Sequence, residues 1–214
     1  MVIEKTKEKE IPIKDKTKIL TYVLMMFFFI KGIIYAIYIV PPMMGMAPDD
    51  IGHFSYVQYL AIEKKLPVLQ ETTIEEIPLL SLIESKKGFF SDLKINDNFH
   101  STNTKNWIVQ HPPLYYLLMV PFYQIATYFT KSLAKILIVL RIVTVLIGVL
   151  TIFVIYKILY NLKTNFYMNS CILFSFVFSP TIQYYFSNVT NDSLLIFLCI
   201  LALFFLIHFF TSQN

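Results

Sequence analysis

Long apolar segments alternate with polar stretches along this chain. The apolar segments cover residues 19–40, 136–160, 167–186 and 194–210. Each is close to the ~20 residues that an α-helix needs to cross the hydrocarbon core of a bilayer. Because only helices and closed barrels satisfy their backbone polar groups in lipid, the pattern predicts an all-α integral membrane protein with four transmembrane helices.

A fifth apolar segment, residues 113–129, allows two interpretations. It is short, it is interrupted by Pro121, and it contains Gln124 and several tyrosines. It could cross the membrane, or it could lie in the interface as a tilted or re-entrant helix. We favour the interfacial arrangement, because residues 187–192 then emerge on the same membrane face as Asp49 and the polar motifs gather on one surface.

A long polar stretch separates the first span from the others. We interpret residues 41–135 as an external loop that contains interfacial or re-entrant helices. Residues 51–64 have the pattern of an amphipathic helix, and a further short helix is expected near residues 77–85. With the remaining three spans in residues 136–214, we expect a single membrane domain that covers residues 19–214.

Composition and charge support this interpretation. The 214 residues are 56% hydrophobic, and the mean hydropathy of +0.60 is one that soluble domains rarely reach. Lysines alternate with acidic residues before the first span. A nucleic-acid-binding arm would be more purely basic, so no nucleic-acid partner is expected. We interpret residues 1–18 as a basic cytoplasmic flank that obeys the positive-inside rule.

The first apolar segment is too long for a secretory signal and is followed by no small-residue cleavage site, so we expect it to remain as a transmembrane helix. The chain is then a multi-pass membrane protein with a cytoplasmic N-terminus. In a prokaryotic cell its location would be the plasma membrane. Residues from Pro41 onward would begin on the external side.

Two adjacent carboxylates follow the first span. Asp49 and Asp50 lie where a helix begins, and aspartate often caps such a position. Capping needs only one carboxylate, however, and His53 follows one turn along the same helix face. Such a group can bind a divalent cation or hold one carboxylate as a general base. We therefore treat Asp49 and Asp50 as candidate catalytic residues, and Asp49, Asp50 and His53 as candidate metal ligands.

Other polar side chains sit at the edges of apolar segments. His111 precedes Pro112 and Pro113, and is either an interfacial histidine or a hydrogen-bond donor to a lipid phosphate. Arg141 either reaches out to the interface or pairs with phosphate or an acidic loop residue. Asp192 opens the last span, where capping is the simple explanation.

A lysine in the first span also requires explanation. Lys31 lies near the middle of the apolar segment, where a charge costs ~2.5–3.5 kcal/mol on insertion scales. A partner is therefore expected, but the sequence does not identify it.

The ordered set of motifs resembles the GT-C glycosyltransferases, and within them the protein O-mannosyltransferase and aminoarabinose transferase branch. The resemblance covers most of the chain from residue 19 to residue 210. Its motifs are Pro48-Asp49-Asp50 with His53-Phe54, then His111-Pro112-Pro113-Leu114-Tyr115-Tyr116, an apolar span led by Arg141, Ser179-Pro180, and Asn191-Asp192-Ser193.

The resemblance implies a membrane enzyme that takes a sugar from a polyprenyl-phosphate carrier at the external face. It implies that Asp49 is the base that activates the acceptor, with Asp50 beside it as a supporting acid or metal ligand. His111 would contact the donor phosphate or position the loop, and Asp192 would lie in the external cavity. We add His53 and Arg141 as substrate-binding candidates, with membrane lipid and the lipid-linked donor as partners.

Three alternatives concern what the chain does by itself. Family members usually have more spans, so this chain is expected to resemble the N-terminal half of a longer transferase. It could be a fragment, or it could need a second chain for the missing spans. It could also be a non-catalytic membrane subunit in which the aspartates only cap a helix. A small transporter component, with Lys31 and Arg141 lining a pathway, is the third possibility.

Overall fold

The computed structural model describes residues 13–39, 50–68 and 106–213, and within these ranges the regular secondary structure is entirely helical. Two short elements accompany the α-helices: η1 is a π-helix and η2 a 3₁₀-helix. In chain order the elements are α1 (Ile13–Ile34), η1 (Tyr35–Ile39), α2 (Asp50–Glu63), η2 (Trp107–Gln110), α4 (Leu114–Phe129), α5 (Leu133–Asn161), α6 (Phe166–Phe178), α7 (Pro180–Phe186) and α8 (Asn191–Ser212).

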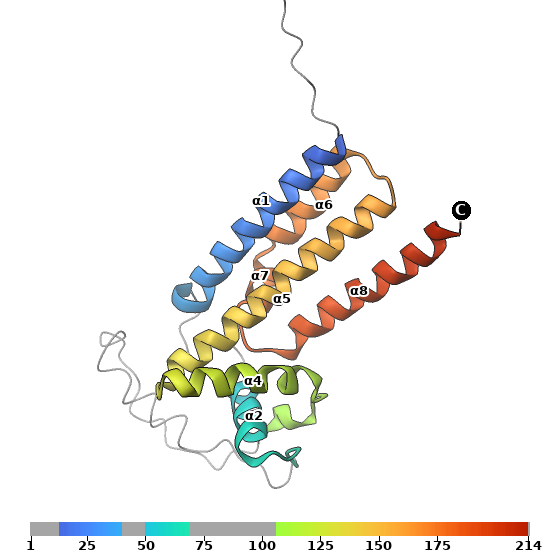
Figure 1. Cartoon of the computed structure of the whole chain (residues 1–214). Coiled ribbons are helices and arrows are strands. Elements are labelled where there is room, and N and C mark those ends of the chain that lie inside the picture. The colour runs from blue at the N-terminus through green and yellow to red at the C-terminus, as the bar shows by residue number, and fades with distance from the viewer. Residues whose placement is uncertain (1–12, 40–49, 69–105, 214) are drawn as a thin grey trace, which may run out of the picture.

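The long helices form a bundle. Helices α1, α5 and α6 lie side by side, and α8 runs along α5 (Figure 1). Among the described residues, three helices are long and apolar enough to cross a membrane, and they cover Asp15–Tyr38, Leu133–Asn161 and Asn191–Ser212. The prediction of an all-α membrane protein is confirmed at this level.

The segment predicted as the third span, residues 167–186, forms two helices. Helix α6 ends at Phe178, and Ser179 adopts an extended conformation (φ −62°, ψ 120°) before α7 begins with Pro180. Proline has no N–H to continue the α6 ladder and its ring clashes with the preceding turn, so the helix stops there. At 13 residues, α6 is shorter than the candidate spans.

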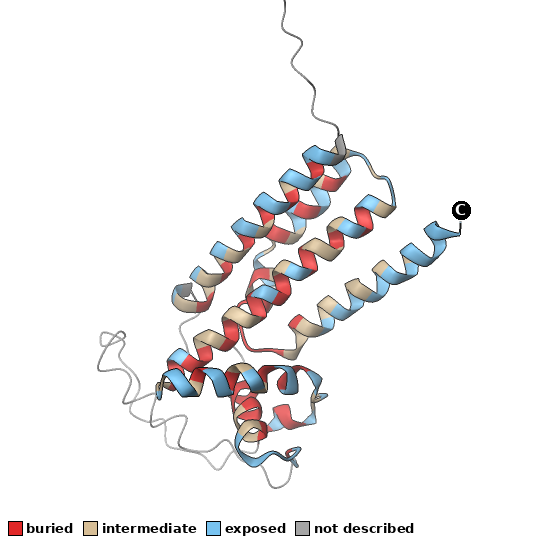
Figure 2. Cartoon of the chain, viewed as in Figure 1, coloured by how far each residue is buried: buried red, intermediate tan, exposed pale blue. Residues whose placement is uncertain are grey.

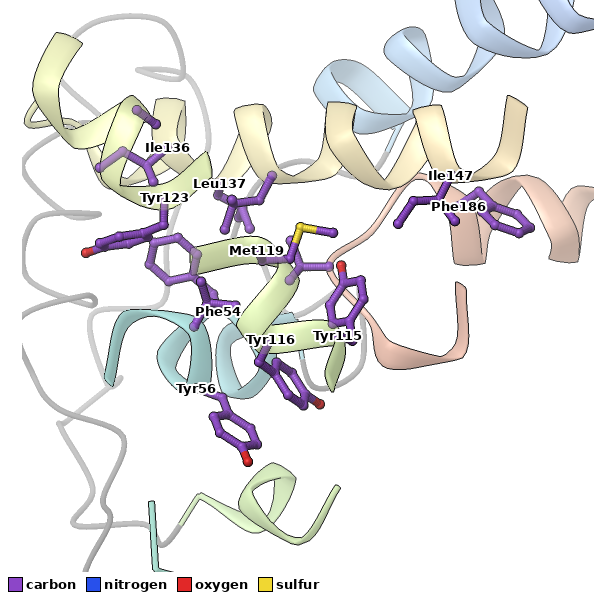
Figure 3. Packing of buried hydrophobic residues seen from close by; sticks show 14 of the residues in the cluster. Phe54, Tyr56, Tyr115, Tyr116, Met119, Tyr123, Ile136, Leu137, Ile147 and Phe186 are labelled. Atoms are coloured by element: carbon purple, nitrogen blue, oxygen red, sulfur yellow. The ribbon is translucent and has the colours of Figure 1, made fainter. Parts of the chain in front are cut away.

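Helix α4 lies across one end of the bundle instead of along it (Figure 1). Its inner side packs on α2 and α5, and Figure 3 shows Tyr115, Tyr116, Met119 and Tyr123 directed into this contact. Its outer side exposes large apolar residues, among them Tyr128 at 86%. This orientation agrees with the interfacial alternative for residues 113–129.

Buried residues lie mainly where the helices face one another, and exposed residues lie on their outer sides (Figure 2). Apolar side chains of α1, α5, α6 and α7 face one another, whereas α8 has Ser193 as its buried residue and exposes apolar side chains along its length. Neighbouring helices approach α5 closely at Gly148. A Cβ there would lie 2.6 Å from the Phe28 ring and 2.8 Å from the Phe186 ring, so only glycine fits.

The helix predicted at residues 51–64 is confirmed by α2, which covers Asp50–Glu63. Its amphipathic pattern is not, because residues 52–57 are all buried. Helix α1 begins at Ile13, inside the predicted basic flank. The helix expected near residues 77–85 lies outside the described residues, as do Asp49 and the rest of residues 69–105 of the external loop.

Candidate polar site at the end of the bundle

A buried ion pair joins α2 to α5. The Arg141 Nη2 atom lies 2.6 Å from Oδ2 of Asp50, and the side chains are 0% and 2% exposed, respectively. Nη1 of the same guanidinium donates to the carbonyl oxygen of Ala36 in η1, at 2.8 Å. The second carboxylate oxygen of Asp50 accepts a hydrogen bond from the backbone N–H of Val189, at 3.3 Å.

This pair therefore ties together four parts of the chain: α2, η1, α5 and the segment between α7 and α8. The two charges offset each other, and the backbone groups of Ala36 and Val189 supply further hydrogen bonds, which a charge pair in an apolar interior requires. Arg141 does not reach out to the interface. It pairs with an acidic residue, one of the roles that its sequence position left open, and it presents no surface to a lipid phosphate in this conformation.

A second polar contact connects α2 to α4. His53 Nδ1 and the Tyr116 hydroxyl are 2.8 Å apart and share a hydrogen bond whose donor depends on the imidazole tautomer. Burial lowers the pKa of His53 to about 4, and His111 adds to the effect. Burial raises the pKa of Tyr116, and the neighbouring Tyr115, Tyr56 and Asp192 raise it further. Both groups are therefore neutral near pH 7.

His111 lies beside this pair. The rings of His53 and His111 have centroids 5.9 Å apart, and Nδ1 of His111 is 3.2 Å from Nδ2 of Asn191 at the start of α8. The half-exposed His111 therefore stands between the α2–α4 contact and α8.

The short helix η2 positions His111. The Asn106 side chain accepts from the N–H of Ile108 at 3.1 Å, which caps η2, and donates to the carbonyl of Gly52 at 3.0 Å, which holds η2 on α2. The N–H of His111 closes the turn by donating to Ile108. A Cβ at Gly52 would lie 2.7 Å from Ile108, so the close contact of η2 with α2 requires glycine.

Tyr115 is the α4 residue that lies next to the ion pair. Its hydroxyl is 2.8 Å from Oγ1 of Thr144 on α5. Burial raises its pKa, and hydrogen bonds from Thr144, the Thr190 backbone and Ser193 partly oppose the shift. Tyr115 thus links α4 to α5 and to the start of α8, next to the Asp50–Arg141 pair.

The structure brings Asp50, His53, His111, Arg141 and Asp192 to one end of the bundle. Asp192 is half-buried at the start of α8, where its N–H donates to the Thr190 hydroxyl, 3.3 Å away. Asp49, the candidate base, lies outside the described residues. No cluster of three or more His, Cys, Asp or Glu side chains occurs within residues 13–39, 50–68 and 106–213, so the metal site at Asp49, Asp50 and His53 stays a prediction.

The sequence does not predict the role of every group in this polar site. Tyr115 and Tyr116 are part of the quoted motif, but two adjacent tyrosines at the start of an apolar helix equally suit an aromatic belt. The Val189 contact uses a backbone N–H and leaves no signal in the sequence. No protein-family model matches this chain, and no significant match was found among curated proteins or solved structures.

Proposed function

We propose that this chain is a membrane glycosyltransferase that moves a sugar from a polyprenyl-phosphate donor to an acceptor at the external membrane face. The observation that carries the proposal is the gathering of Asp50, His53, His111 and Asp192, from widely separated positions in the sequence, at one end of an apolar helix bundle. Polar groups at that depth meet the headgroup of a donor whose lipid tail stays in the bilayer.

The two aspartates have different roles in this proposal. Both carboxylate oxygens of Asp50 are engaged, one by Arg141 and one by Val189. Asp50 therefore holds the beginning of α2 in place instead of acting as an acid or metal ligand. Asp49 is the base: it accepts the acceptor hydroxyl proton while the acceptor oxygen bonds to the sugar's anomeric carbon. The bond from that carbon to the phosphate breaks, and the phosphate leaves with the electron pair.

The leaving phosphate needs a hydrogen-bond donor. Among the described candidates, His111 suits this role, because it is half-exposed at the edge of the site. The Nδ2 atom of Asn191 donates to its Nδ1, so Nε2 carries the proton that a phosphate oxygen can accept. A hydrogen bond that strengthens as charge develops on the leaving phosphate lowers the barrier to transfer. His53 is buried and bonded to Tyr116, so it supports the site rather than contacting the donor.

The test is sugar transfer in membranes that express the full chain, with radiolabelled polyprenyl-phosphate sugars as donors. Asp49→Asn is expected to lower the transfer rate by a factor of ~10²–10⁴, the usual contribution of a general base. Glu63→Gln, at the exposed end of α2, is the matched control and should transfer at the wild-type rate. Wild-type transfer by Asp49→Asn would refute the assignment of the base.

A non-catalytic membrane subunit is the second candidate, and the engagement of Asp50 favours it. The ion pair with Arg141 and the hydrogen bond from Val189 give the buried Asp50 a structural role that needs no chemistry. Absence of transfer with every donor tested, from a chain whose α2 and α4 are folded, would support this candidate. Co-purification of a second membrane chain would then identify the source of the missing spans.

A further inference from the structure

Lys31 has a defined partner in the structure. It lies within the first candidate span, and its Nζ donates to the carbonyl oxygen of Val177, 3.1 Å away. The ammonium also lies 5.7 Å from the ring centroid of Phe178 and 5.8 Å from that of Tyr35. Val177 and Phe178 are the last residues of α6, so Lys31 contacts the C-terminal end of a helix in the neighbouring segment.

The break between α6 and α7 creates the need for this contact. The last carbonyls of a helix have no intrahelical donor. In an unbroken helix the N–H of Thr181 would serve the Val177 carbonyl, whereas Pro180 has no N–H for the Phe176 carbonyl and interrupts the helix. In lipid an unsatisfied carbonyl costs several kcal/mol. A cation at a helix C-terminus also offsets the negative end of the helix dipole. Lys31 supplies both the donor and the charge.

Helix α1 contacts the broken segment on both sides of the break. Phe28 packs against Phe176 of α6, with centroids 6.2 Å apart, and against Phe186 of α7, with centroids 6.1 Å apart. Gly32 lets Gln183 of α7 approach closely, since a Cβ there would be 3.1 Å from its Nε2 atom. One face of α1 therefore holds α6 and α7 at a fixed relative direction.

The same face of α1 leads to the polar site. Ala36, one turn beyond Gly32, accepts the hydrogen bond from Arg141. On the other side, α7 leads to Val189, whose N–H donates to Asp50. The direction in which α7 leaves the break thus decides whether Val189 reaches the buried carboxylate.

We propose that Lys31 is a positioning residue: by capping the end of α6 at the Ser179-Pro180 break, it fixes the course of α7 and holds the 187–190 segment on Asp50. This role differs from lining a transport pathway, and it holds whether or not the chain transfers sugar.

The experiment measures how fast a thiol reacts at position 189. Val189→Cys places a small reporter at a fully buried position, in a background with the exposed cysteines replaced by Cys171→Ser and Cys199→Ser. Labelling of the full chain by a membrane-permeable maleimide is compared with and without Lys31→Met. Loss of a hydrogen bond from a charged group should increase labelling about tenfold or more. Ile30→Met, at an exposed neighbouring position, is the matched control and should not change the rate.

A double-mutant cycle with Pro180→Ala decides the mechanism. Alanine returns an N–H to the break, and a continuous helix would give the Val177 carbonyl an intrahelical donor. Lys31→Met should then have little effect on labelling at position 189. An unchanged rate in Lys31→Met alone, or an equal increase with and without Pro180→Ala, would overturn the proposal.

A reporter on α5 guards against general unfolding. Thr151→Cys, at another fully buried position, should stay protected in every variant. If Lys31→Met exposes Thr151→Cys as well, the cycle still decides: recovery of protection in the Pro180→Ala background supports the capping role, and its absence excludes it.

Discussion

The Asp50–Arg141 pair makes a quantitative prediction about stability. Arg141→Met keeps an unbranched apolar stem but removes the guanidinium, which leaves the buried Asp50 carboxylate without its cation and the Ala36 carbonyl without its donor. Breaking a buried pair in this way costs about 3–5 kcal/mol. For a chain of this size each kcal/mol lowers the unfolding midpoint by roughly 2–4 °C, so a fall of about 6–20 °C is expected.

Thermal unfolding of the detergent-solubilised chain, followed by circular dichroism, measures this shift. Lys135→Met is the matched control, because Lys135 is exposed in the first turn of the same helix and should change the midpoint by little. The double variant Arg141→Met with Asp50→Leu removes both charges and should recover most of the loss, since an apolar pair of similar volume is often as stable. If Arg141→Met melts with the wild type, the pair does not anchor α2, and the reasoning fails.

Two further predictions concern packing and pH. Gly148→Ala should lower the free energy of unfolding by about 1–3 kcal/mol, because its Cβ would meet two buried phenylalanine rings. Leu150→Ala, at an exposed position of α5, is the control and should change it far less. The unfolding midpoints of both variants, measured in one detergent, test this prediction. Because burial lowers the pKa of His53 to about 4 in the folded state, the unfolded state binds more protons between pH 6.5 and 4. The free energy of unfolding should therefore be constant above pH 6.5 and fall by up to about 3 kcal/mol on acidification to pH 4. This pH dependence should be lost in His53→Gln but kept in His208→Gln. A pH dependence that survives His53→Gln would contradict its assignment to the buried His53.

The sequence predicted the parts of the fold that depend on local composition. Apolar length identified the three candidate spans, and the helical pattern of residues 51–64 identified α2. Pro180 lies within the predicted span 167–186, but the apolar length of that segment predicts one continuous helix, whereas the structure has two. Proline also occurs at position 121, inside α4, without ending the helix. At Pro180 the chain is extended at Ser179, and Lys31, far away in the sequence, donates to the Val177 carbonyl beside the break. Neither segment specifies this long-range contact.

The same limit applied to the polar site. Asp50 and Arg141 are 91 residues apart, and nothing in either segment specifies the other as its partner. The sequence therefore left Arg141 with several possible partners and gave both aspartates a chemical role. Only the ion pair between the start of α2 and Arg141 on α5 shows that Asp50 is engaged. The contact of η2 with α2 brings His53 and His111 together.

Adjacent aspartates with different roles should separate stability from activity. Asp50→Asn leaves the buried guanidinium of Arg141 without its counter-charge, so the chain should lose stability as Arg141→Met does. If Asp49 is the base, Asp49→Asn should abolish transfer while the unfolding midpoint stays within the range of an ordinary surface substitution. Measuring both quantities on both variants tests the division directly. Should Asp49→Asn lower the midpoint as much as Asp50→Asn does, the two carboxylates would act as one structural unit, and the loss of transfer would no longer identify a base.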